Sequence, residues 1–282
     1  MQHQFYTLPE VAKMVGGQLV GEAEGLRISD LLIDSRHLVD ARQALFFALT
    51  STRNDGHKYI KELYDKGLRA FVVKRLPQED FPEAVFIVVP DTLKALQTLA
   101  ARHRQQFDIP VIGITGSNGK TIVKEWLYQM LSPEHNIVRS PKSYNSQVGV
   151  PLSVWQMNET YDMGIFEAGI SEPDEMMALQ DIIRPTIGVF TNIGQAHDEN
   201  FISRAQKVGE KMNLFTKAES LVYCMDYSEI QQVVMRSGMA SKVKLFTWSR
   251  KFEESDLLIS EVSVGRSIAK CSAAIKVLIC RL

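Results

Sequence analysis

One stretch of the chain combines residue types that bind phosphate: VIGITGSNGKT, residues 111–121. Its apolar start, 111–114, has the β-branched composition of a buried strand. The segment that follows, IVKEWLYQML, places four apolar side chains at helical spacing: Ile122, Trp126, Leu127 and Met130. The glycines therefore lie at a turn from strand to helix, where the backbone N–H groups of the loop and of the helix N-terminus attract an anion.

The chemistry expected of this turn is nucleotide binding. Lys120 would reach the terminal phosphates, and the Thr121 hydroxyl would join the coordination shell of Mg²⁺. The standard loop has a glycine five residues before Gly119, where this chain has Ile114. The simpler alternative is a glycine turn followed by a surface lysine, but the flanking strand and helix favour the phosphate loop. The residues predicted to bind the nucleotide here are Gly116, Ser117, Asn118, Gly119, Lys120 and Thr121.

Composition bounds the remaining possibilities. The chain has 282 residues, 45% of them apolar, which is enough for two packed domains. Lys and Arg (32) nearly equal Asp and Glu (33), so no overall field points to nucleic acid or to a membrane surface. The three cysteines show no metal-binding or disulfide pattern, and the sequence has neither a signal peptide nor an 18-residue apolar run. We expect a cytoplasmic protein without membrane insertion.

The elements that must position the loop indicate an α/β fold. In the first hundred residues, short apolar runs alternate with helical patterns, with strands expected at 44–49, 70–73 and 85–89. A first domain is predicted over 1–106. From residue 107, further strands within 163–170, 186–194, 220–225 and 242–248 predict a doubly wound, mostly parallel sheet up to residue 262. Ligands of such sheets bind outside the carboxyl ends of the strands.

The last segment, 263–282, differs from the rest. From Val262 onward it has four basic residues, no acidic ones and no clear periodicity. We interpret it as an atypical tail to a truncated domain; an ordinary amphipathic helix is the alternative.

Several polar residues follow strands of the second domain. Glu167 ends one apolar run, and an acid beside a phosphate loop completes a Mg²⁺ site in many nucleotide enzymes. Asn192 and His197 follow another run, although imidazole is an unusual ligand of Mg²⁺. Asn145 and Ser146, in a polar loop, could donate hydrogen bonds to a phosphoryl or carboxyl oxygen. Each of these residues, taken alone, has an ordinary structural explanation.

In the first domain, the candidates lie in IDSRHL (33–38) and RNDGHKYI (53–60). The planar guanidinium of Arg36 could bind a diphosphate, with Ser35 beside it. Asp55 and His57 belong to a DGH turn that is equally compatible with a structural role.

Five features of the chain in combination resemble the Mur ligases of bacterial cell-wall synthesis. They are GITGSNGKT, SYNSQVGVPLS, FEAGISEPDEM, TNIGQAHDENF and a lysine fourteen places after His197. The chain is most similar to the branch that joins D-alanyl-D-alanine to UDP-N-acetylmuramoyl-tripeptide, especially the form fused to an alanine racemase. The resemblance implies a UDP-muramoyl-peptide-binding domain at 1–106 and a P-loop ATPase domain at 107–262. It also implies that a third, amine-binding domain is missing, so we expect this chain to ligate poorly by itself.

The resemblance assigns roles to individual residues. Lys120 corresponds to the phosphate-loop lysine, and Thr121, Glu167 and His197 correspond to the ligands of Mg²⁺. Asn145 matches an asparagine near the reacting phosphoryl group, Asn192 lies in the matching nucleotide-site turn, and Lys211 falls where the family carries a carbamylated lysine. The substrate-binding residues implied are Ser35, Arg36, Asp55, His57, Asn145 and Ser146.

The implied reaction uses ATP and Mg²⁺ to phosphorylate the terminal carboxylate of the muramoyl tripeptide, and the amine of D-alanyl-D-alanine then attacks the acyl phosphate. One departure concerns Ser51 and Thr52, which stand where relatives commonly have a glycine-bearing turn near UDP. Two alternatives stay open: another ligase of the superfamily, such as a folylpolyglutamate synthase, and a non-catalytic nucleotide-binding module.

Overall fold

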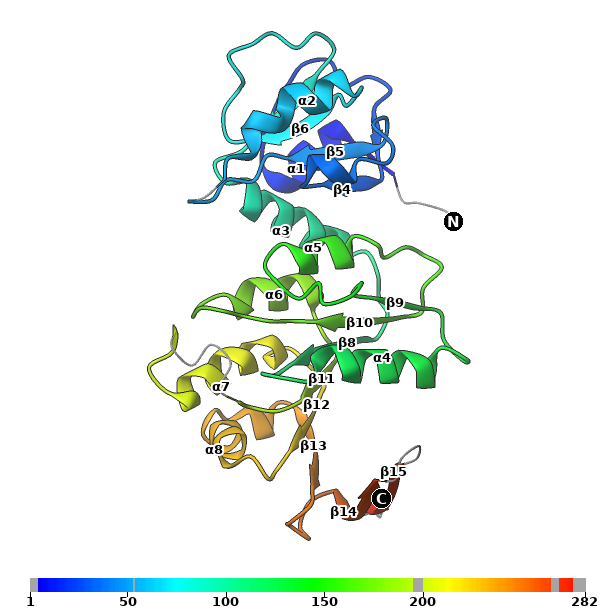
Figure 1. Cartoon of the computed structure of the whole chain (residues 1–282), viewed down its shortest axis with the longest axis vertical. Helices are drawn as coiled ribbons and strands as arrows, with labels where there is room; N and C mark the ends of the chain where they lie inside the picture. The colour runs from blue at the N-terminus through cyan, green and yellow to red at the C-terminus, as the bar shows by residue number, and fades with distance from the viewer. Residues whose placement is uncertain (1–4, 53, 195–199, 265–268, 276–282) are drawn as a thin grey trace. The chain divides into compact units, whose positions relative to one another are not determined.

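The computed structural model describes residues 5–52, 54–194, 200–264 and 269–275 (Figure 1). The chain divides into two compact units, Met1–Asp108 with Pro151–Thr160, and Ile109–Val150 with Tyr161–Leu282. The segment Pro151–Thr160, which the sequence pattern placed in the second domain, thus belongs to the first unit. Within that unit the Trp155 indole donates to the Ser29 carbonyl at 2.8 Å.

The first unit is built on a five-stranded sheet. Its order is β2 (Gln18–Val20), β7 (Val85–Val88), β6 (Ala70–Val73), β5 (Ala44–Phe47) and β4 (Asp30–Leu32). Strands β4 to β7 pair in parallel, and β2 is antiparallel to β7. A separate two-stranded sheet pairs β1 (Tyr6–Thr7) with β3 (Arg27–Ile28). The loops after β4, β5 and β6 therefore emerge at one edge.

Local sequence signals explain the helices of the first unit, α1 (Leu8–Val15), α2 (Ile60–Asp65) and α3 (Thr92–Arg104). Thr7 and Glu10 form a reciprocal capping box at the start of α1. The Asp91 side chain caps α3 by accepting from the Lys94 N–H, as its position before the apolar pattern predicts. The core against β5 and β6 includes the fully buried Phe46 and Phe71.

The second unit contains an eight-stranded sheet whose order can be followed in Figure 1. From one edge to the other its strands are β9 (Ile137–Arg139), β10 (Met163–Glu167), β8 (Val111–Thr115), β11 (Ile187–Phe190), β12 (Ser220–Cys224), β13 (Lys244–Ser249), β14 (Leu257–Val264) and β15 (Ala269–Ile275). All neighbours are parallel except the last pair. The prediction of a mostly parallel α/β sheet is confirmed.

Helices pack on both faces of this sheet: α4 (Lys120–Leu131), α6 (Met176–Ile183), α7 (Arg204–Met212) and α8 (Ser228–Arg236). Helix α5 (Gly149–Val154) spans the boundary at which the chain passes to the first unit. Leu127 and Leu131 of α4 pack on Ile112 and Ile114 of β8. On the opposite face, Gly113 lies so close to Pro185 that a Cβ there would be 2.8 Å from the ring. This alternation along β8 is the doubly wound arrangement predicted from the sequence.

Two details depart from the sequence pattern. Three of the four residues that predicted α4, Ile122, Trp126 and Met130, are exposed. Their spacing identified the helix, but the buried face lies elsewhere. The tail forms β15 rather than the helix left open as an alternative, and it pairs antiparallel with β14. Among the described helices, none has the length and hydropathy needed to cross a membrane.

Candidate active site

The phosphate loop connects β8 to α4 and owes its shape to two glycines. Gly116 has a φ of 143°, and a Cβ at this position would lie 2.0 Å from Thr191 Oγ1. Gly119 is the N-cap of α4 with a φ of 81°. Both backbone conformations favour glycine. Ile114, which occupies the position of the glycine missing from the standard motif, is still a core residue of β8. The turn therefore begins only at Gly116.

The turn after β11 holds the loop from the other side. The Asn192 side chain accepts from the Asn118 N–H at 3.0 Å and donates to the Asn118 carbonyl at 3.1 Å. The Ser117 N–H donates to the Asn192 carbonyl, and Ser117 Oγ accepts from the Gly194 N–H at 2.9 Å. Asn192, predicted to bind nucleotide, thus fixes the loop itself in this structure.

The carboxyl ends of β8 and β10 bring the predicted metal and phosphoryl residues together. Glu167 is fully buried, and its Oε2 accepts from Thr121 Oγ1 at 3.1 Å and from Asn145 Nδ2 at 3.4 Å. Thr121 Oγ1 also lies 3.1 Å from Ser143 Oγ. These contacts place a carboxylate, a hydroxyl and an amide around one point beside the phosphate loop.

The oxygen-rich donor set suits a hard cation such as Mg²⁺. Glu167 Oε1 is buried and lies 3.0 Å from the Lys124 ammonium, so the carboxylate is held in its ionised form, which is the form that binds a metal ion. His197, the third predicted ligand, lies outside the described residues. Among those that are described, no cluster of three His, Cys, Asp or Glu side chains is present. Glu167 and Thr121 are therefore the described residues that fit the ion.

Two predicted lysines line a pocket at this edge of the sheet. Lys120 Nζ donates to the Gly116 carbonyl at 2.9 Å. The Lys120 pKa is below its ordinary value, because the effect of burial exceeds the opposite effect of Glu167. Lys211, on α7, is 3% exposed and makes no hydrogen bond or ion pair within the described part of the chain. Burial, with smaller effects of Lys120 and Lys207, lowers the Lys211 pKa to about 7. The predicted residues lining the pocket are Gly116, Ser117, Lys120, Asn145, Ser146 and Lys211.

The predicted substrate residues of the first unit follow β4 and β5. Arg36 is exposed and forms a two-pronged ion pair with Asp34, with its Nη2 2.6 Å from Oδ2. Ser35 is buried and donates to Glu62 at 3.4 Å. Arg36 thus presents its charge to solvent, whereas the Ser35 hydroxyl faces the protein.

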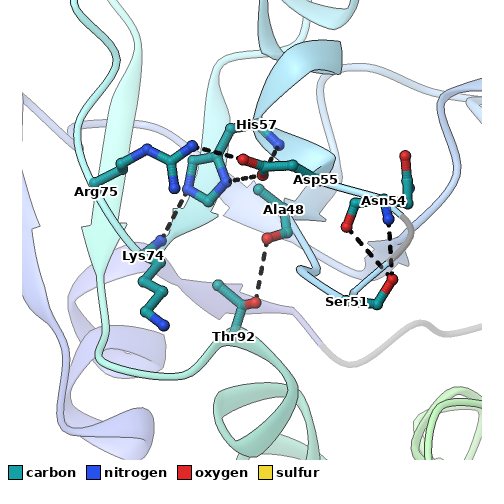
Figure 2. A network of polar contacts seen from close by, with 8 residues as sticks. All are labelled: Ala48, Ser51, Asn54, Asp55, His57, Lys74, Arg75 and Thr92. Atoms are coloured by element: carbon teal, nitrogen blue, oxygen red, sulfur yellow. Dashed lines mark hydrogen bonds and ion pairs between the residues drawn. The ribbon is translucent and has the colours of Figure 1, made fainter.

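Asp55 and His57 form a closed network with the loop after β6 (Figure 2). The His57 Nε2 accepts from the Lys74 N–H at 3.1 Å, so its Nδ1 carries the proton donated to Asp55 at 2.6 Å. Arg75 donates to the other Asp55 oxygen at 2.5 Å. Burial raises the Asp55 pKa, but the hydrogen bonds from His57 and Arg75 outweigh it and leave the pKa well below its ordinary value.

The remaining residues of this turn have structural roles that the sequence motif left open. A Cβ at Gly56 would lie 2.8 Å from the Leu49 N and O atoms, so the turn needs glycine for close packing. Ser51, at the departure from the family pattern, accepts from the Asn54 N–H at 3.1 Å through its Oγ, which also donates to the Asn54 carbonyl at 3.4 Å (Figure 2). Binding of substrate by Asp55 and His57 stays a prediction.

Sequence reasoning missed four charged or polar residues of these regions: Lys124, Ser143, Lys207 and Arg75. Lys124 is fully buried at an ion pair with Glu167, and Lys207 donates to the Gly194 carbonyl at 2.7 Å. One signal was available for Lys124. It lies four residues after Lys120 and three before Leu127, and hence on the face of α4 that packs inward.

Residues 114–277 match the Mur ligase middle domain, which covers the phosphate loop, Glu167, Lys211 and most of the tail. The chain belongs to the Mur ligase family. Two curated relatives are both named UDP-N-acetylmuramoyl-tripeptide--D-alanyl-D-alanine ligase. The one from Synechocystis is 39% identical over 62% of this chain and 38% of its own length, and the one from Bacillus subtilis is 31% identical over 80% and 50%.

Solved structures of Mur ligases share the fold. MurF from Acinetobacter baumannii aligns with a TM-score of 0.88 at 22% identity, over 98% of this chain and 60% of that one. MurF ligase from Thermotoga maritima in complex with ADP aligns with a TM-score of 0.74 at 24% identity, over 86% and 55%. The chain spans about half the length of the curated relatives it matches.

Proposed function

We propose that this Mur ligase chain supplies the nucleotide and UDP-muramoyl-peptide sites of an ATP-dependent ligase that joins D-alanyl-D-alanine to UDP-N-acetylmuramoyl-tripeptide. The observation that carries the proposal is the convergence of Lys120, Thr121, Asn145, Glu167 and Lys211 at one edge of the second sheet. The names of the two curated relatives support the substrate pair, and ADP bound to the Thermotoga maritima relative supports the nucleotide.

The residues suggest a division of labour. Backbone N–H groups of Ser117 to Lys120 and the Lys120 ammonium would hold the β and γ phosphates of ATP. Thr121, Glu167 and His197 would hold Mg²⁺, which supplies neutralisation of charge as the γ-phosphoryl group moves to the tripeptide carboxylate. Asn145 would donate to the transferring group or to the oxyanion formed when the amine attacks the acyl phosphate.

Lys211 fits the carbamylated position of the family on physical grounds. With a pKa lowered to about 7, a large fraction of its amine is neutral near neutral pH, and a neutral amine can add CO₂. The resulting carbamate would replace a buried positive charge by a negative one beside the metal site. Carbamylation of Lys211 is part of the proposal.

The first test measures what the chain binds. We expect UDP-N-acetylmuramoyl-tripeptide to bind saturably and to protect the first unit from hydrogen exchange, with ADP and Mg²⁺ protecting residues 116–121. A folate should protect neither. Binding of folate without binding of the muramoyl peptide would replace the proposal by a folylpolyglutamate synthase activity.

The second test separates an enzyme from a binding module. Release of inorganic phosphate from ATP should require both the muramoyl tripeptide and D-alanyl-D-alanine. The assay should be run on this chain and on a polypeptide completed with the C-terminal region of a relative. Nucleotide binding with no release that depends on the two substrates, in either polypeptide, would favour the binding module.

A further inference from the structure

A lysine outside the phosphate loop lies at the centre of the candidate site. Lys124 is on α4, one helical turn after Lys120, and its side chain is fully buried. Burial of an ammonium group is costly unless charge and hydrogen bonds compensate it. The groups that contact the Lys124 ammonium therefore indicate the role of this buried charge.

The Lys124 ammonium contacts three elements at once. It lies 3.0 Å from Glu167 Oε1 at the end of β10, and it donates to the Ser140 carbonyl at 2.8 Å and to the Lys142 carbonyl. On its own helix it pairs with Glu125 at 3.2 Å. One side chain thus joins the phosphate-loop helix to the strand end that carries the acid and to the loop that carries Asn145.

These contacts complement those of the opposite carboxylate oxygen. Glu167 Oε2 faces Thr121 and Asn145, whereas Oε1 faces Lys124, so the plane of the carboxylate is fixed from both sides. The Glu167 N–H donates to Ser140 Oγ, which fixes the backbone as well. The 140–142 loop carries a cost of its own, because Lys142 is a non-glycine residue with a φ of 49°.

We propose that Lys124 is a positioning residue: it orients the Glu167 carboxylate and the 140–146 loop so that both can act on a metal-bound nucleotide. The inference rests on the proposed nucleotide site. A buried ion pair is weak evidence for net stabilisation, since desolvation offsets the attraction of the charges. A fixed carboxylate orientation accounts for the pair, because residues that hold metal ligands tune metal affinity without touching the ion.

The experiment compares ADP affinity with Mg²⁺ and with EDTA, by calorimetry on the purified chain. The ratio of the two affinities measures how well the site couples metal to nucleotide. In Lys124→Met we expect this ratio to fall about tenfold, the size typical for a residue that supports a metal ligand, while metal-free ADP binds within about twofold of the unaltered chain. The matched control is Lys217→Met, which removes an exposed lysine paired with Asp181 in the same unit and should leave both affinities unchanged.

A structural role alone gives a different result. It predicts that both affinities fall together or that neither changes, and an unchanged ratio in Lys124→Met would overturn the proposal. If the unaltered chain shows no effect of Mg²⁺ on ADP binding, the proposed nucleotide site fails instead. The two failures are therefore distinguishable.

A second comparison covers the case in which Lys124→Met does not fold. Glu167→Gln removes the carboxylate charge through which Lys124 is proposed to act, and adding Lys124→Met to it leaves no unpaired acid at this site. The single Glu167→Gln and the double variant should show the same ratio of ADP affinities, because the effect of Lys124 passes through Glu167. A further tenfold loss in the double variant would show that Lys124 acts independently and would refute the positioning role.

Discussion

Charged side chains gather after parallel strands in both units, but the two clusters differ in how their charges are balanced. In the first unit, Asp55 is neutralised by Arg75, and both nitrogens of His57 have partners. In the second unit, Lys211 is buried without a hydrogen bond or ion pair among the described residues, and its pKa is lowered to about 7. A cluster whose charges are balanced can hold a loop without a ligand, whereas a buried group with a strongly shifted pKa is typical of a candidate functional site.

The largest effect is expected in the second unit, at the phosphate loop. Lys120→Met should weaken binding of ADP with Mg²⁺ by about 100-fold, because a charged donor to phosphate is lost from a half-buried site. Calorimetry with purified chain measures this loss. Lys217→Met is the control and should bind as the unaltered chain does. A loss below about threefold would mean that the loop does not hold the phosphates.

The strand, turn and helix around the phosphate loop could be predicted because their signals are local. The strand, the two glycines and the helix of the phosphate loop are contiguous in the sequence. The carboxyl ends of parallel strands lie at the same edge of the sheet, independently of the conformation of the connecting loops. Glu167 was a candidate from its place at a strand end and Asn145 from its polar loop, whereas Lys211 was added by the family resemblance. The structure brings the three to one pocket or one hydrogen-bond network.

Other features depend on tertiary contacts that no local pattern encodes. The spacing of Lys124 from Leu127 could have placed it on the inward face of α4, but its partners could not be predicted, because they include carbonyls 16 and 18 residues away. The hydrogen bonds of the Asn192 side chain to the Asn118 backbone could not be read from the sequence, and binding of nucleotide by Asn192 stays a prediction. In the first unit, the partners of His57 include the backbone of Lys74, 17 residues further on. Motif reading could not decide between binding and packing there.

The next effect tests the uncompensated charge of Lys211 through the pH dependence of stability. Its pKa is about 7 in the folded chain and about 10.4 when unfolded, so between these values only the unfolded state binds the proton. Stability therefore rises with pH. Relative to Lys211→Met, the free energy of unfolding should increase by roughly 1 kcal/mol per pH unit from pH 7 to pH 9. Urea titrations in CO₂-free buffer measure it.

A parallel experiment adds bicarbonate, to detect carbamylation of Lys211 directly. If Lys211 is carbamylated, ¹³C-labelled bicarbonate should give a carbamate signal in the NMR spectrum that Lys211→Met lacks. A difference in stability that does not change with pH would show that the ammonium is compensated, and the contrast between the two clusters would disappear.

A smaller effect is expected from the closed network of the first unit. His57→Ala leaves the Lys74 N–H and the Asp55 carboxylate each short of a partner, which should cost about 1–2 kcal/mol of local stability. Hydrogen exchange of peptides from 44–75 measures the loss, and ADP binding should not change. His37→Ala, at an exposed histidine of the same unit, is the control. If His37→Ala increases hydrogen exchange in these peptides as much as His57→Ala does, the His57 network does not stabilise the loop specifically.

The smallest effect sharpens the comparison at the edge of the first cluster. Arg36 is exposed and paired only across a surface ion pair with Asp34, so Arg36→Gln should leave the unfolding transition unchanged. If its guanidinium contacts a diphosphate, UDP affinity should fall about fivefold, since a charge-assisted bond at an exposed site contributes little. Arg42→Gln is the matched control, because Arg42 is exposed before β5, at the opposite end of the strand from the substrate residues. Equal UDP affinity in the two variants would show that Arg36 does not belong to the substrate site. The structural network of Asp55, His57 and Arg75 would then be the only role supported for the charged residues after β4 and β5.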